Sequence, residues 1–91
     1  MPDRQLPGSD LIDAGILDLK EGVESLGALV VSIGSPRLRI LGFEVPELPI
    51  DSPEHRLYRL LEREDPRTAH SRYNALVRRL VSFERAVECG G

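Results

Sequence analysis

One stretch of the sequence carries the residue types that contact phosphate groups and base edges. Residues 66–88 hold five arginines against two glutamates, which gives a formal charge of +3. At helical spacing, the polar residues of this stretch fall on one face, opposite its apolar residues. Arginine, asparagine and serine contact phosphates and bases in nucleic-acid complexes. The pattern indicates a candidate nucleic-acid-binding face composed of Arg67, Ser71, Asn74, Arg78 and Arg85.

The charge of the whole chain argues against nucleic acid as the main partner. The 91 residues include 12 Lys and Arg against 15 Asp and Glu, a formal net charge of −3. Domains that bind nucleic acid typically carry a basic patch within a basic domain. A solvated helix face explains the same polar residues at least as well, so nucleic-acid binding is kept as the alternative prediction.

A second candidate for chemistry is the pair Arg63 and His70, which six residues separate. This spacing resembles the Arg-x(4–6)-His motif of HEPN ribonuclease domains, which are small helical bundles that dimerise. The resemblance implies that Arg63 and His70 cleave RNA at a dimer interface. It covers eight residues and includes Pro66, so RNA cleavage by this pair also belongs to the alternative prediction.

Other kinds of catalytic or cofactor site find no support in the sequence. The chain has two histidines and one cysteine, and it lacks the His-x-x-Glu and Glu-x-x-His spacings of helical metal ligands. One cysteine excludes a disulfide framework. Phosphate-binding glycine loops and nucleophile elbows are absent as well. We therefore expect neither a metal nor a cofactor, and the sequence favours a non-catalytic protein.

The elements that must position these residues are predicted to be helices. Three of them begin with the same two-residue motif, in which a residue with a capping side-chain oxygen is followed by proline at the first helical position. These pairs are Ser35-Pro36, Ser52-Pro53 and Asp65-Pro66. We expect two long helices over about 10–33 and 66–88, and two short ones over about 36–41 and 53–64. They form a single domain over 9–89, with residues 1–8 flexible and residues 90–91 frayed.

The two long helices carry unbroken rows of apolar residues at alternating spacings of four and three. One row runs from Ile12 to Ile33 and the other from Ala69 to Val87. Such a row favours side-by-side packing with another helix at a shallow angle. The sequence therefore predicts an all-α bundle in which the two long helices pack antiparallel.

The segment from Phe43 to Ile50 contains two prolines, which exclude a helix and favour an extended chain. Its apolar residues Val45, Leu48 and Ile50 indicate that it lies against the core.

The end of the first long helix is apolar on almost every side, and such a helix is normally buried on every side. A helix of this length extends about 36 Å, whereas a compact chain of this size is roughly 31 Å across. Either the short helices and the segment from Phe43 to Ile50 cover this surface, or a second copy of the chain does. We favour the second copy and therefore expect a homodimer. Gly15 and Gly22 would let a second helix approach, and the partner-binding flank would consist of Leu11, Leu29 and Val31.

Charge and hydropathy complete the functional prediction. Residues 1–34 carry six acidic and two basic side chains, so this N-terminal segment is acidic. The apolar stretches are too short to span a bilayer, and the first residues do not resemble a signal peptide, so no membrane partner is expected. The sequence predicts a small cytoplasmic interaction or regulatory module that self-associates. A further protein partner is compatible with this prediction.

Overall fold

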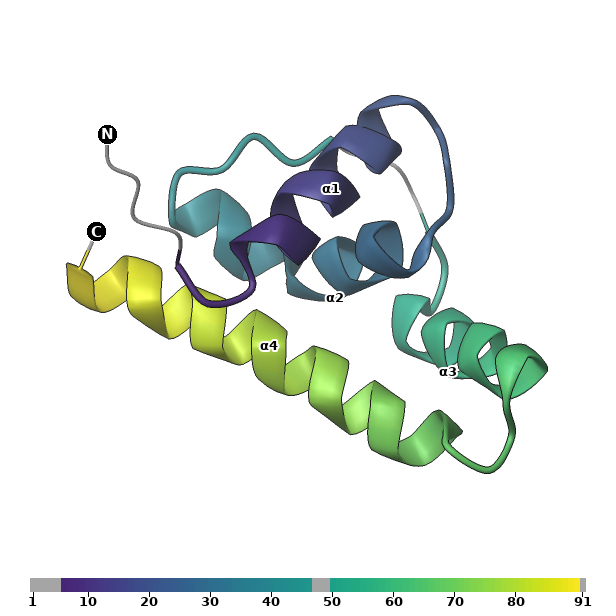
Figure 1. The fold of residues 1–91 in the computed structure, drawn as a ribbon. Helices are drawn as coiled ribbons and strands as arrows, with labels where there is room; N and C mark the ends of the chain where they lie inside the picture. The colour runs from purple at the N-terminus through teal and green to yellow at the C-terminus, as the bar shows by residue number, and fades with distance from the viewer. Residues whose placement is uncertain (1–5, 47–49, 91) are drawn as a thin grey trace.

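The computed structural model describes residues 6–46 and 50–90, which form four helices and no strand (Figure 1). These are α1 (Ser9–Lys20), α2 (Leu26–Ile40), α3 (Pro53–Glu64) and α4 (Ala69–Gly90). The predicted all-α fold with four helices is confirmed. The molecule measures 39 × 25 × 20 Å. Leu48 and the chain ends, 1–5 and 91, lie outside the described residues.

The predicted single helix over 10–33 is wrong, because α1 ends at Lys20. Gly22 adopts a left-handed conformation with φ of 74°. Its N–H donates to the Leu19 carbonyl at 3.1 Å, and the N–H of Val23 donates to the Asp18 carbonyl at 2.8 Å. These two hydrogen bonds form a Schellman motif, which uses glycine to end a helix. Gly22 therefore ends a helix instead of admitting a partner helix.

Ser25, three residues after Gly22, is the N-cap of the next helix, α2, which begins at Leu26. The Oγ of Ser25 accepts a hydrogen bond from the backbone N–H of Ala28 at 3.1 Å, and it donates to Asp18 Oδ2 at 2.6 Å. The first bond satisfies a free donor of α2, and the second ties the start of α2 to the last turns of α1. The two helices therefore form a hairpin.

The short helix predicted over 36–41 is the last part of α2, which continues through Pro36. Pro36 is exposed, so water can reach the backbone carbonyl that loses its intrahelical partner there. The helix ends at Ile40, and Gly42 follows it with φ of 103°. The glycine stop at Gly42 was predicted correctly.

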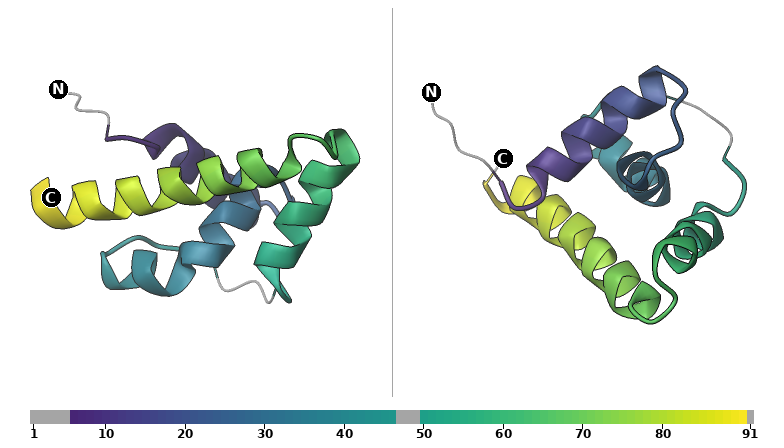
Figure 2. Two further views of the ribbon diagram at one scale, coloured as in Figure 1. Left: turned by 90° about the horizontal axis from the view of Figure 1, so that it is seen from below. Right: turned by 45° about the vertical axis from the view of Figure 1, so that its right-hand side comes forward.

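α2 is the central helix, and it packs against each of the other three (Figure 2). Leu29, Val30 and Val31 are at most 1% exposed. The helix that is apolar on every side is thus buried by its own chain, which removes the original reason for expecting a second copy around it. The core also includes Ile12, Leu19, Ala28, Leu38, Leu57, Leu61, Ala69, Leu80 and Phe83.

The predicted antiparallel packing of the two long helices is also wrong. The apolar row of α4 does face the core, but its main neighbours are α2 and α3. Gly34 lies against Leu80 and Glu84, and Arg37 pairs with Glu88 one turn further along both helices. α2 and α4 therefore run in the same direction where they meet. The break at Gly22 causes this, because it turns α2 back across α1.

α3 has the predicted bounds, whereas α4 begins three residues later than predicted. Asp65 Oδ1 accepts from the backbone N–H of Arg67 at 3.0 Å, and the Asp65 carbonyl accepts from Thr68 at 3.2 Å. The Asp-Pro pair therefore forms a turn ahead of the helix. Ser52 precedes α3 with a left-handed φ of 47° and makes no side-chain cap. Of the predicted Ser-Pro pair, only the proline at the first helical position has its expected role there.

The segment after α2 lies against the core, as predicted. Val45 is buried, and the ring of Phe43 lies 5.3 Å from the ring of Phe83, measured between centroids. The guanidinium of Arg39 donates to the carbonyls of Val45 and Pro46, which fixes this segment beside the end of α2. Leu6, ahead of α1, also packs on the core.

Candidate functional site

The outer face of α4 presents most of the predicted polar residues to solvent. Ser71, Asn74, Arg78 and Arg85 are all exposed. Val81, which is 40% exposed, lies between the two arginines on the same side of the helix. Arg67 is exposed as well, but it lies in the turn ahead of α4. We call Ser71, Asn74, Arg78, Val81 and Arg85 the basic face of α4.

The outer face of α1 has the opposite charge. Leu17 is 55% exposed, which is high for a large apolar side chain. Asp10, Asp13 and Glu21 are exposed at helical spacings around it. Lys20 is exposed at the edge of this surface. We call Asp10, Asp13, Leu17 and Glu21 the acidic face of α1.

The two charged faces do not neutralise each other within the chain. The ion pairs in the described residues join Arg37 to Glu88, Arg56 to Glu24, and Arg72 to Glu64 at 2.8 Å, and none links α1 with α4. α1 and α4 also make little contact, because α2 lies between most of their lengths (Figure 2).

The predicted partner-binding flank is not a surface. Leu29 is 1% exposed and Val31 is fully buried, while Leu11 is half-buried against the core. These side chains fill the space between α2 and its neighbours. Sequence reasoning missed the actual outer face of α1, although the spacing of Asp10, Asp13, Leu17 and Glu21 could have revealed it.

The structure does not bring Arg63 and His70 together. His70 is exposed on the first turn of α4, where its Nε2 lies 3.3 Å from Asn74 Nδ2 and its ring lies 6.4 Å from that of Tyr58. Arg63 is five residues after Tyr58 on α3, which is about 140° around the helix. Arg63 instead lines a pocket with Glu24. Within one chain, His70 thus lies beside Tyr58 and Asn74, whereas Arg63 lines a pocket with Glu24.

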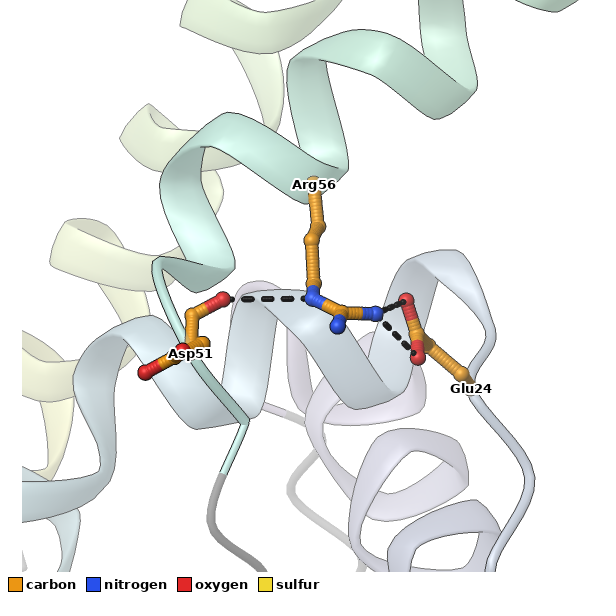
Figure 3. A network of polar contacts seen from close by, with 3 residues as sticks. All are labelled: Glu24, Asp51 and Arg56. Carbon is orange, nitrogen blue, oxygen red and sulfur yellow. Dashed lines mark hydrogen bonds and ion pairs between the residues drawn. The ribbon is translucent and has the colours of Figure 1, made fainter.

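The pocket that Arg63 lines is composed mainly of charged and polar residues, and sequence reasoning did not predict it. It has a volume of about 410 Å³ and is lined by Glu24, His55, Arg56, Arg59, Leu60 and Arg63. Figure 3 shows how Arg56 is held: Nη1 donates to both carboxylate oxygens of Glu24 at 3.0 Å, and Nε donates to the Asp51 carbonyl at 3.2 Å.

A groove of about 330 Å³ separates α2 from α4 and contains Glu84. Burial raises the pKa of Glu84, Arg37 acts to lower it, and Glu88 raises it further. Val77 and Val81 line the same groove beside Ile33 of α2. Glu84 is thus a half-buried carboxyl on an otherwise largely apolar lining.

The described part of the chain shows neither a metal-ligand cluster nor a membrane-spanning helix. Within residues 6–46 and 50–90, no three His, Cys, Asp or Glu side chains gather closely enough to hold a metal ion. Cys89 is exposed near the end of α4. No helix in the described part of the chain is long and apolar enough to cross a membrane.

A comparison with protein-family models finds no match, and comparisons with curated proteins and with solved structures find none either.

Proposed function

We propose that the protein is a small non-catalytic interaction module that self-associates in the cytoplasm. The acidic face of α1 in one copy binds the basic face of α4 in another. The observation that supports this most strongly is the pair of oppositely charged faces, each with an exposed apolar residue at its centre. Leu17 is the apolar residue on α1, and Val81 is its counterpart on α4.

The two faces are of comparable length, and each combines charged residues with one exposed apolar residue. From Asp10 to Glu21 the acidic face extends about 16 Å, and from Ser71 to Arg85 the basic face extends about 21 Å, at the rise of an α-helix. Contact between them would bury Leu17 and Val81 together while their charged neighbours pair around the edge. An apolar centre with a polar rim is the usual anatomy of a protein interface.

The contact is expected to be weak and sensitive to salt. Exposed ion pairs contribute about 0.2–1 kcal/mol each, and the remaining stabilisation comes from only two apolar side chains. Screening shortens the range of such pairs from about 10 Å in 0.1 M salt to about 3 Å in 1 M salt. Because unlike faces are joined, the contact either closes into a ring or extends into a longer assembly.

Light scattering on a size-exclusion column tests this proposal. At 0.1 M salt and high protein concentration, the mass should exceed the 10.1 kDa of one chain, and it should fall towards that value in 1 M salt. Arg78→Glu with Arg85→Glu should abolish the association. Arg59→Glu with Arg63→Glu changes the net charge equally on another surface and should leave it intact. A monomeric wild-type protein at both salt concentrations would overturn the proposal.

Nucleic-acid binding remains the second candidate, because Ser71, Asn74, Arg78 and Arg85 are exposed along one side of α4. Fluorescence polarisation with a labelled DNA duplex and an RNA hairpin tests it. Salt-dependent affinity that Arg78→Glu removes would favour this candidate. Loss of RNA cleavage in His70→Ala would be needed to support an enzyme.

A further inference from the structure

The arginine pocket on α3 is a separate feature from the two charged helix faces. It contains three arginines and one glutamate, a formal local charge of +2, in a chain whose net charge is −3. A volume of about 410 Å³ falls within the range of small-molecule sites. We propose that this pocket binds a compact anionic ligand that carries two or more phosphate groups, independently of self-association.

One of its arginines is already held in place. Two nitrogens of Arg56 are fixed by Glu24 and by the Asp51 carbonyl, as Figure 3 shows. The third, Nη2, has no hydrogen bond with any residue of the described chain, so it can donate to a ligand. A guanidinium that is fixed before binding loses less conformational entropy when the ligand arrives.

The other two arginines follow Arg56 along the same side of α3. Arg59 and Arg63 are exposed and form no ion pair within residues 6–46 and 50–90. Like charges four residues apart on a helix repel each other and destabilise it. A bound anion would remove this repulsion and would gain charge-assisted hydrogen bonds with both side chains.

The lining indicates the class of anion. From Arg56 to Arg63 the helix rises about 10 Å, so a ligand with two or more phosphate groups can meet all three guanidinium groups without their converging on one point. Guanidinium groups bind phosphate oxygens in pairs, which favours phosphate over a simple halide. Among the described residues that line the pocket, Leu60 is the only apolar one and His55 carries the only aromatic ring, so no Phe, Tyr or Trp is there to stack on a base. A compact phosphate chain therefore fits better than a nucleic-acid strand.

Isothermal titration calorimetry with inorganic pyrophosphate and tripolyphosphate, at low salt, tests the proposal. Both should bind the wild-type protein, and Arg59→Gln with Arg63→Gln should weaken binding at least tenfold. Arg78→Gln with Arg85→Gln removes the same charge from α4 and should change the affinity less than twofold. Glu24→Gln removes the negative charge among the lining residues but keeps an amide oxygen that can accept from Arg56, so it should tighten binding.

Three results would overturn the proposal. The first is no heat of binding with either phosphate compound at millimolar concentration. The second is an equal loss of affinity in the α3 and α4 double variants, which would show a response to net charge alone. The third is tighter binding of a short RNA strand with the same dependence on Arg59 and Arg63, which would make this surface a nucleic-acid site.

Discussion

Replacing Gly15 with alanine should force α1 away from α2 and destabilise the whole bundle. The two helices cross where Gly15 meets Gly27, with backbone against backbone. A β-carbon on Gly15 would lie 2.3 Å from the Gly27 carbonyl oxygen and 2.6 Å from a methyl group of Val31. The oxygen belongs to the helix backbone and cannot rotate away, so the helices themselves must separate.

The size of the effect follows from that distance. The contact is about 1 Å shorter than ordinary van der Waals contact. Relieving it by separating the helices opens gaps of about 0.5–1 Å elsewhere between them, and such a gap loses about a quarter to a half of each dispersion contact. Overpacking of this kind costs about 1–3 kcal/mol. Alanine returns about 1 kcal/mol through its higher helix propensity. Because the clash involves rigid backbone, we expect a net loss of about 2 kcal/mol, or roughly 8–16 °C in Tm.

Thermal and urea unfolding followed by far-UV circular dichroism would measure this loss. Gly34→Ala is the matched control, because its β-carbon would meet the movable ends of Leu80 and Glu84, the nearest at 2.8 Å. These side chains can shift, so this variant should lose less than half as much stability. If Gly15→Ala is as stable as the wild type, the close crossing of α1 and α2 is incorrect.

Two further substitutions test the cap and the buried carboxyl. Ser25→Ala removes the cap on Ala28 and the bond to Asp18, so it should lower stability by about 1 kcal/mol in urea unfolding, and an unchanged midpoint would contradict the cap. The pKa of Glu84 is raised in the folded protein, so the folded state binds more protons than the unfolded state. The free energy of unfolding of the wild type therefore falls as pH rises from about 4.3, the ordinary pKa of Glu, through the raised pKa. Glu84→Gln cannot ionise, so its stability relative to wild type should increase from pH 4 to pH 7, and a constant difference would contradict the burial of Glu84.

The elements that the sequence predicted correctly are those whose signals agree. For α3, the proline at its first position and the apolar spacing of Leu57 and Leu61 point to the same bounds. In the first half of the chain the signals conflict. The apolar row continues across Gly22 and Val23 and predicts one helix. In contrast, Gly22 is typical of a helix C-terminus and Ser25 of a helix N-cap. Local turn chemistry prevailed, and Val23 is 47% exposed as a result.

The candidate surfaces were harder to predict because they depend on that break. With α2 folded back, Leu29 and Val31 become core residues, and the acidic side of α1 becomes its outer face. The exposure of the polar residues of α4 was easier to predict, because they lie opposite an apolar row that faces the core. The arginine pocket combines α3 with Glu24 from the loop after α1, and no local pattern brings those two segments together.

Mixing two charge-reversed variants tests the proposed self-association most directly. Asp10→Arg with Asp13→Arg makes the α1 face basic, and Arg78→Glu with Arg85→Glu makes the α4 face acidic. Each variant alone then presents two faces of like charge and should have the 10.1 kDa mass of one chain by light scattering. An equimolar mixture should regain a larger mass, because each face again meets one of opposite charge. A mixture that stays at the mass of one chain, while the wild type associates, would contradict contact between these two faces.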